Sequence, residues 1–277
     1  MDGREFIKMH GLGNDFVIVD ARRRGFAPDA GQVRAIADRR TGIGCDQLIV
    51  LRLPADAGAD AAFTIHNADG GEAEACGNAA RCVAWMAMAE TGRDSARLET
   101  AAGPLDARRA GPRAVTVDMG EPRFGWRDIP LAADRDTLHL PLARGPLADP
   151  VAVSMGNPHA VFFVDDAEAV DLAALGLALE HDALFPERAN IGVAEMQGAD
   201  RMRLRVWERG AGLTMACGTG ACAALVAAHR RGQAGRRATV ELDGGTLEIA
   251  WGADNRVSMT GPVAVSFRGA IDGALAG

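Results

Sequence analysis

Tyrosine is absent from the 277-residue sequence, and aromatic residues of all kinds make up only 5% of it. A phenol is therefore unavailable as a general acid. Long apolar runs are also absent, because stretches such as residues 82–89 are far shorter than the roughly 20 residues that span a bilayer as a helix. Residues 1–11 contain no apolar stretch typical of a signal peptide. These absences predict a soluble, cytoplasmic protein.

Basic residues are in the minority: 30 lysines and arginines stand against 37 acidic residues, which gives a net charge of −7 at pH 7. This balance argues against a nucleic acid or an anionic membrane as partner. The chain is long enough for two domains, and 48% of its residues are apolar, so each domain can bury a core.

The five cysteines are the main chemical feature of the sequence. An odd number without a secretion signal predicts free thiols rather than disulfides. Cys76 and Cys217 are each followed by a glycine and an apolar run that predicts a helix, and the free N–H groups of a helix start favour a thiolate. The spacings to Cys82 and Cys222 do not fit a structural zinc site, so we expect no metal and no cofactor. These two cysteines and Cys45 are expected to be structural.

An internal repeat relates the two halves of the sequence. Cys217-Gly218 follows Cys76-Gly77 by 141 positions. Further echoes in the same order are Gly13-Asn14 with Gly156-Asn157, Ile43-Gly44 with Ile191-Gly192, Asn67 with Glu208, and Pro122 with Pro262. The shared order favours an ancient duplication, although glycine-rich loops can also resemble one another by chance. The expected domains are residues 1–120, with residues 264–277 packing back on them, and residues 121–263.

Hydrophobic periodicity predicts short strands around one helix in each half. Strands are expected at 6–9, 16–20, 47–51, 62–66, 97–100, 105–108, 114–119 and 160–164, and helices at 29–41 and 76–90. Residues 83–89 and 222–228 are apolar on every side of a helix and must be enclosed. The expected fold is α/β of the α+β type. It has two pseudo-symmetric domains, each a curved mixed or antiparallel sheet wrapped around a central apolar helix, with the active site in the interdomain cleft.

Two equivalent thiols on opposite walls of a cleft suit the inversion of a carbon centre. One thiolate would remove a proton from one face while the opposite thiol delivers a proton to the other. Positioned acid–base groups contribute about 10²–10⁴-fold, so N–H groups at the helix starts must also hold the α-carboxylate of the substrate. A single activated cysteine would instead indicate acyl transfer and would need a paired base.

Motifs along nearly the whole chain resemble one enzyme family. They are residues 8–16 (KMHGLGNDF), 42–47 (GIGCDQ), 67–70 (NADG), 76–78 (CGN), 154–159 (SMGNPH), 185–190 (FPERAN), 208–212 (ERGAG) and 216–220 (ACGTG). The chain resembles the diaminopimelate epimerases, two-cysteine enzymes that need no cofactor. The resemblance implies a small-molecule substrate and the interconversion of LL- and meso-2,6-diaminopimelate, in lysine and peptidoglycan precursor biosynthesis. The chain departs from the family's frequent residues at Gly71, Ala79 and Leu213.

The resemblance also implies roles for individual residues. Cys76 and Cys217 would be the catalytic acid–base pair, and His159 and Glu208 would set the protonation of the thiols. The implied substrate contacts are Asn14, Gln47, Asn67, Gly77, Asn78, Asn157, Asn190, Glu208, Arg209, Gly218 and Thr219. Arg209 suits a carboxylate because its planar guanidinium binds both oxygens. Members of the family are commonly homodimers.

Three other functions stay open at this point. A proline or hydroxyproline racemase also uses two thiols, but its second motif usually carries aspartate and serine-proline just before the cysteine, where this chain has Thr214-Met215-Ala216. A non-catalytic amino-acid-binding protein would not need both thiols. A thiol redox sensor is the remaining alternative.

Overall fold

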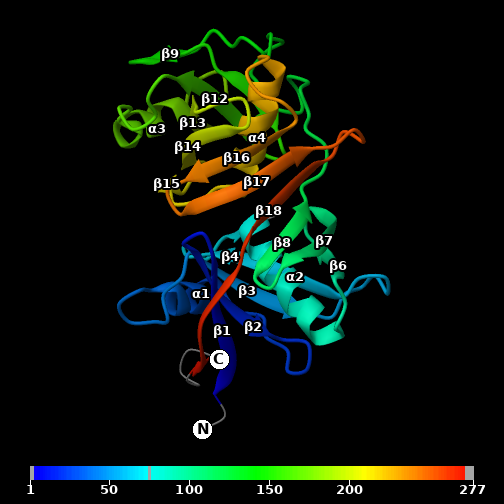
Figure 1. Ribbon diagram of the computed structural model, residues 1–277. Coiled ribbons are helices and arrows are strands. Elements are labelled where there is room, and N and C mark those ends of the chain that lie inside the picture. Colours follow the sequence, from blue (N-terminus) through cyan, green and yellow to red (C-terminus); the bar gives the residue numbers. More distant parts are fainter. Residues whose placement is uncertain (1–2, 74–75, 272–277) are drawn as a thin grey trace. The chain divides into compact units, whose positions relative to one another are not determined.

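The computed structural model of the chain describes residues 3–73 and 76–271 (Figure 1). The chain divides into two units: unit 1 contains Met1–Val117 and Gly261–Gly277, and unit 2 contains Asp118–Thr260. Residues 272–277, the last part of the segment expected to pack on the first domain, lie outside the described residues.

Unit 1 contains a mixed sheet in the order β19-β1-β2-β3-β4-β6-β7-β8. Its strands are β1 (Arg4–Gly11), β2 (Asn14–Asp20), β3 (Gln47–Arg52), β4 (Ala61–Asn67), β6 (Ser95–Thr100), β7 (Gly103–Gly111), β8 (Ala114–Asp118) and β19 (Ala264–Ile271), with the short β5 (Glu72–Ala73) beside β4. Only the pairs β2/β3 and β4/β6 are parallel. A parallel pair needs a long connection, and α1 (Ala30–Ala37) and α2 (Gly77–Thr91) provide it.

The sheet of unit 1 is apolar on both faces. Val17 of β2 and Leu48 of β3 pack with Val33 and Ile36 of α1 in one core cluster. Because side chains alternate along a strand, the neighbouring Phe16 points to the opposite face, where it is fully buried. Helix α2 lies against β1, β4, β6 and β7, so the strands surround it.

Unit 2 repeats this sheet in the order β11-β12-β13-β14-β16-β17-β18. Its strands are β11 (Val151–Ser154), β12 (Pro158–Val164), β13 (Asn190–Met196), β14 (Arg201–Glu208), β16 (Arg237–Leu242), β17 (Gly245–Trp251) and β18 (Val257–Pro262), with β15 (Gly212–Thr214) beside β14 and a separate hairpin of β9 (Ala143–Arg144) and β10 (Leu147–Ala148). The parallel pairs are again β12/β13, connected through α3 (Leu172–Glu180), and β14/β16, connected through α4 (Gly218–Arg230).

Apart from β19 in unit 1 and the β9/β10 hairpin in unit 2, the two units therefore share strand order, strand directions and the positions of both helices. The predicted fold class, an α/β protein with two pseudo-symmetric sheet-and-helix domains, is confirmed. The register also defines equivalent residues: Phe16 pairs with Gln47 in unit 1, and His159 pairs with Asn190 in unit 2.

One of the predicted echoes is wrong. Gly192 lies inside β13, paired with Val206 of β14, whereas Gly44 lies in the loop before β3 with a φ of 79°. By the register, the residue of unit 2 that corresponds to Gln47 is Asn190, so the loop containing Ile43 and Gly44 corresponds to residues before β13. The similarity of the two Ile-Gly pairs is a coincidence of composition.

The helix boundaries follow local signals. Asp29 and Gln32 form a capping box at the start of α1, and Gly92 ends α2 in the left-handed region with a φ of 68°. Residues 222–228 of α4 are buried, as predicted. Complete enclosure of α2 was wrong, because Trp85 and Met86 are only half-buried and Ala89 is exposed. Among the described residues, no helix has the length and apolar character needed to cross a membrane.

Candidate active site

Four of the predicted site residues gather in unit 1 at the start of α2. Cys76 is the N-cap residue of this helix, and its thiol donates to Oδ1 of Asn14 at 3.7 Å. The same oxygen accepts a hydrogen bond of 3.1 Å from Nδ2 of Asn78, in the first turn of α2 beside Gly77. The start of α2 and the start of β2 are thereby held together.

Two further residues lie at neighbouring strand ends of unit 1. Gln47, at the start of β3, pairs in register with Asn67, at the end of β4, and its Nε2 donates to Oδ1 of Asn67 at 2.9 Å. The other side-chain atom, Oε1 of Gln47, is buried and has no hydrogen-bond partner among the described residues. Since a buried acceptor without a partner is unfavourable, this oxygen is suited to accept a hydrogen bond from a bound ligand.

The predicted residues of unit 2 form a hydrogen-bonded chain that ends at Cys217. Nε2 of His159 lies 3.0 Å from Oδ1 of Asn157, and Nδ2 of Asn157 donates to Oγ1 of Thr219 at 3.3 Å. The Thr219 hydroxyl lies 3.5 Å from Sγ of Cys217, the N-cap residue of α4. Sγ also accepts from the backbone N–H of Gly220 at 3.3 Å.

Glu208 approaches the same thiol from the end of β14. Its Oε1 accepts a hydrogen bond of 2.6 Å from the hydroxyl of Thr214 in β15. Burial raises the pKa of Cys217 well above its usual value, and the negative charge of Glu208 raises it further. Hydrogen bonds from Thr219 and Gly220 act in the opposite direction without outweighing these effects.

The helix start favours the thiolate of Cys217 through the N–H of Gly220, as expected, but burial and the charge of Glu208 outweigh this contribution and raise the pKa. Cys217 is only 3% exposed, and the free-energy cost of burying a thiolate exceeds the stabilisation that the N–H groups of the helix start provide. Cys217 therefore rests as a thiol beside the side chain of Glu208.

His159 is neutral at physiological pH. Burial lowers its pKa from an ordinary value near 6.5 to about 3, and the positive charge of Arg209 acts in the same direction. With a proton on Nε2, the neutral ring donates to the Asn157 oxygen. Because His159 donates to Oδ1 of Asn157, the Asn157 amide presents its Nδ2 to the hydroxyl of Thr219, which lies beside Cys217.

Acid should destabilise the fold through His159. The unfolded chain protonates this residue below pH 6.5 while the folded chain stays neutral down to about pH 3, so the free energy of unfolding falls by up to about 1.4 kcal/mol per pH unit within that window. The free energy of unfolding, measured by urea denaturation, should therefore fall by about 2 kcal/mol more in the wild type than in His159→Gln when the pH is lowered from 7 to 5. His139→Gln, at a site that is 52% exposed, is the control and should behave like wild type. Equal losses in wild type and His159→Gln would contradict the expectation.

Asn190 and Arg209 are joined to each other in unit 2. Oδ1 of Asn190 accepts from the backbone N–H of Arg209 at 2.9 Å, and its Nδ2 donates to the carbonyl oxygen of Pro158 at 2.9 Å. The amide of Asn190 is 97% buried and occupied by these two bonds. The Arg209 guanidinium is exposed and donates to the carbonyl oxygen of Glu187 at 3.0 Å.

Three residues that support the site were not singled out from the sequence. Asp46 binds Asn14, Thr214 binds Glu208, and Glu180 binds both Trp207 and Gly210, on either side of Glu208 and Arg209. Asp46 lies within the motif at residues 42–47, so the sequence did contain a signal that could have indicated it as a site residue. The contact of Glu180 with β14 spans about 30 residues of sequence and leaves no local pattern.

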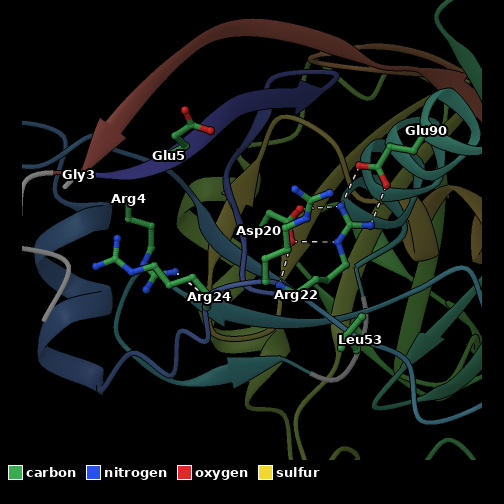
Figure 2. A pocket seen from close by; sticks show the side chains of 9 residues that line it. Gly3, Arg4, Glu5, Asp20, Arg22, Arg24, Leu53 and Glu90 are labelled. Atoms are coloured by element: carbon green, nitrogen blue, oxygen red, sulfur yellow. Dashed lines mark hydrogen bonds and ion pairs between the residues drawn. The ribbon is translucent and has the colours of Figure 1, made fainter.

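A hollow of about 810 Å³ lies elsewhere in unit 1, and none of the predicted site residues lines it (Figure 2). Two of the arginines that line it are engaged within the chain: Arg22 forms ion pairs with Asp20 and Glu90, and Arg4 donates to the carbonyl oxygens of Arg24 and Gly25. No group of three or more potential metal-binding side chains occurs in the described part of the chain.

Comparison with known proteins agrees with the motifs. A family model described as diaminopimelate epimerase matches residues 6–125 and 151–266. The diaminopimelate epimerase of Rhodospirillum centenum is 58% identical over 266 residues, covering 96% of this chain and 91% of its own, and that of Phenylobacterium zucineum is 59% identical over 271 residues, covering 96% and 97%. The fold is shared with a hydroxyproline epimerase from Agrobacterium vitis, at a TM-score of 0.68 and 17% identity over 99% of this chain and 94% of that chain. Because the family model matches both units and these relatives align over nearly their full lengths, the chain belongs to the diaminopimelate epimerase family.

Proposed function

We propose that this chain interconverts LL- and meso-2,6-diaminopimelate without a cofactor, using Cys76 and Cys217 as two bases that act on opposite faces of the α-carbon. The observation that carries the proposal is the equivalent placement of the two cysteines. Each is the N-cap residue of the central helix of its unit, in a fold whose two halves repeat the same order of strands and helices around it. The reaction belongs to lysine and peptidoglycan precursor biosynthesis.

The proposed chemistry is a proton exchange at one carbon. The thiolate of one cysteine takes the α-proton of the substrate and becomes a thiol, while the electron pair of the broken C–H bond moves toward the carboxylate. The thiol of the other cysteine then gives its proton to the opposite face and becomes a thiolate. The reverse reaction exchanges the two roles, so no net proton is consumed.

Both helix starts can stabilise the charge that develops on the carboxylate. The first N–H groups of a helix have no partner within the helix and point along its axis. Gly77 and Asn78 in α2, and Gly218 and Thr219 in α4, occupy these positions. The proposal requires that both helix starts reach one substrate molecule, in a cleft between the domains formed by residues 1–120 with 264–277 and residues 121–263.

The remaining predicted residues fit the two ends of a diamino-dicarboxylic acid. Arg209 has an exposed guanidinium suited to a second carboxylate. Gln47 has a buried acceptor oxygen suited to an ammonium group. Asn67, Asn157 and Glu208 complete the polar lining that we propose, with His159 and Glu208 setting the protonation of the thiols.

We also propose a homodimer in the cytoplasm. The family resemblance supports the dimer, and the five cysteines, all free, fit a reducing compartment. Sedimentation equilibrium would test the dimer, for which the monomer mass is 28.9 kDa.

The test of the proposed function is α-hydrogen exchange in D₂O. Incubation with meso-diaminopimelate should introduce deuterium at the α-carbon and produce the LL isomer, as followed by NMR and chiral chromatography. L-Proline serves as the competing substrate. Exchange in proline with none in diaminopimelate would replace the proposal by a proline racemase, and exchange in neither would reject both.

A further inference from the structure

The equivalent asparagines of the two units present opposite ends of their amides to the helix starts. In unit 1, Asn14 turns its carbonyl oxygen toward Cys76 and Asn78. In unit 2, Asn157 turns its amide nitrogen toward Thr219, which is equivalent to Asn78, and its oxygen toward His159. The repeated fold therefore carries a chemical asymmetry at the two cysteines.

Asp46 accounts for the orientation of Asn14. Its Oδ2 accepts from Nδ2 of Asn14 at 2.9 Å and from the backbone N–H of Asp15 at 3.0 Å. A carboxylate only accepts hydrogen bonds, so a reversed amide would place oxygen against oxygen. The equivalent position in unit 2, immediately before Asn190, is Ala189, which cannot impose an orientation.

Asp46 is itself fixed by a cluster of charged residues. Its Oδ1 pairs with Arg39 at 2.7 Å, and its backbone N–H donates to Asp15 at 2.9 Å. Asp15 pairs with Lys8 at 2.6 Å and with Arg39 at 2.7 Å. Burial raises the pKa of Asp15, but hydrogen bonds from Arg39 and Lys8 outweigh this and hold the pKa well below its usual range. These ion pairs and hydrogen bonds therefore hold the Asp46 carboxylate in a fixed position beside Asn14.

We propose that Asp46 is a positioning residue for the epimerisation: it locks the amide of Asn14 so that an acceptor oxygen, and not a donor N–H, faces the thiol of Cys76. This inference rests on the proposed function of Cys76. An acceptor stabilises the protonated thiol and preserves the strength of the thiolate as a base. A reversed amide would donate to the thiolate and weaken it.

The test measures the pH dependence of Cys76 alkylation by iodoacetamide in the substrate-free protein, with mass spectrometry of the Cys76 peptide. Asp46→Asn leaves one acceptor oxygen for which Arg39 and Asn14 compete, and Asp46→Ala removes both oxygens. In either variant the carboxylate that opposes reversal of the Asn14 amide is lost, and only the hydrogen bond from Nδ2 of Asn78 still favours the original orientation. The reversed amide should therefore become populated, and the alkylation midpoint should fall by about 0.5–1 pH unit, which is three- to tenfold more thiolate below the midpoint. A merely loosened structure would change the rate without moving the midpoint.

Asp20→Asn is the matched control. Asp20 is the last residue of β2, and its carboxylate pairs with Arg22 at 2.6 Å and is 45% exposed, against 43% for Asp46. This variant should keep the wild-type midpoint. Among the other charged or titratable described residues on and beside the elements around Cys76, the ones that stay unchanged in every variant include Lys8, His10, Asp15, Arg39, His66, Glu72, Arg81 and Cys82.

Loss of the Asp46 charge could also lower the midpoint directly, and a double variant separates the two causes. In an Asn14→Ala background, Asp46→Asn should leave the midpoint unchanged, because the amide through which Asp46 acts is gone. An equal shift with and without Asn14 would overturn the proposal, as would an unchanged midpoint in both Asp46 variants. No substrate is used, so these outcomes are independent of whether diaminopimelate is turned over.

Discussion

Serine in place of Cys76 or Cys217 should reduce the epimerisation of diaminopimelate by about 10²–10⁴-fold or more. A serine hydroxyl keeps its proton at neutral pH and cannot serve as the base, whereas a thiol can ionise. Because each cysteine acts as base in one direction and acid in the other, either variant should lose both directions together. The measurement is the rate of LL isomer formation from meso-diaminopimelate, and of the reverse, by chiral chromatography.

Hydrogen exchange would show that the two thiols serve opposite faces of the carbon. Each single variant keeps one thiol, so in D₂O it should still exchange the α-proton of one stereoisomer without inverting it. The Cys76 and Cys217 variants should exchange different stereoisomers. Cys82→Ala and Cys222→Ala, in the same two helices and fully buried, are the controls and should retain epimerisation in the folded protein. Near-normal turnover in either serine variant would refute the two-base mechanism.

Local sequence signals made the positions of the two cysteines in the fold predictable. A cysteine and a glycine before an apolar run marked the starts of both α2 and α4, and the structure places Cys76 and Cys217 at both N-caps. The repeat also indicated two similar halves before any strand pairing was known. Such features depend on residues that are close in sequence, so periodicity and capping rules reach them.

The protonation of the site was not predictable in the same way. The helix start was visible around Cys217, but its burial and the carboxylate of Glu208 come from β14 and the packed core, and they determine the pKa. Likewise, the role of Asp46 depends on which end of the Asn14 amide it meets, a contact across 32 residues. Sequence motifs indicated which residues matter, and only the fold specifies their partners.

Loss of the Glu180 carboxylate should strongly destabilise unit 2. This carboxylate of α3 is only 2% exposed, accepts from Nε1 of Trp207 at 2.8 Å and from the backbone N–H of Gly210 at 3.0 Å, and lies 3.5 Å from Arg188. Glu180→Ala would leave both N–H donors without their acceptor, and a buried donor without a partner costs about 1–3 kcal/mol. The free energy of unfolding should therefore fall by about 3–5 kcal/mol, as measured by urea denaturation.

Glu180→Gln separates this stability effect from the position of the site. Glutamine keeps the shape but offers one acceptor oxygen, so its stability should lie between wild type and Glu180→Ala. Since Trp207 and Gly210 flank Glu208 and Arg209, the folded glutamine variant should also bind diaminopimelate more weakly, with a several-fold higher KM. Glu168→Gln, at a carboxylate of the same unit that is 61% exposed, is the control and should change neither quantity. A Glu180→Ala protein within about 0.5 kcal/mol of wild type would show that α3 does not hold the end of β14 through this carboxylate.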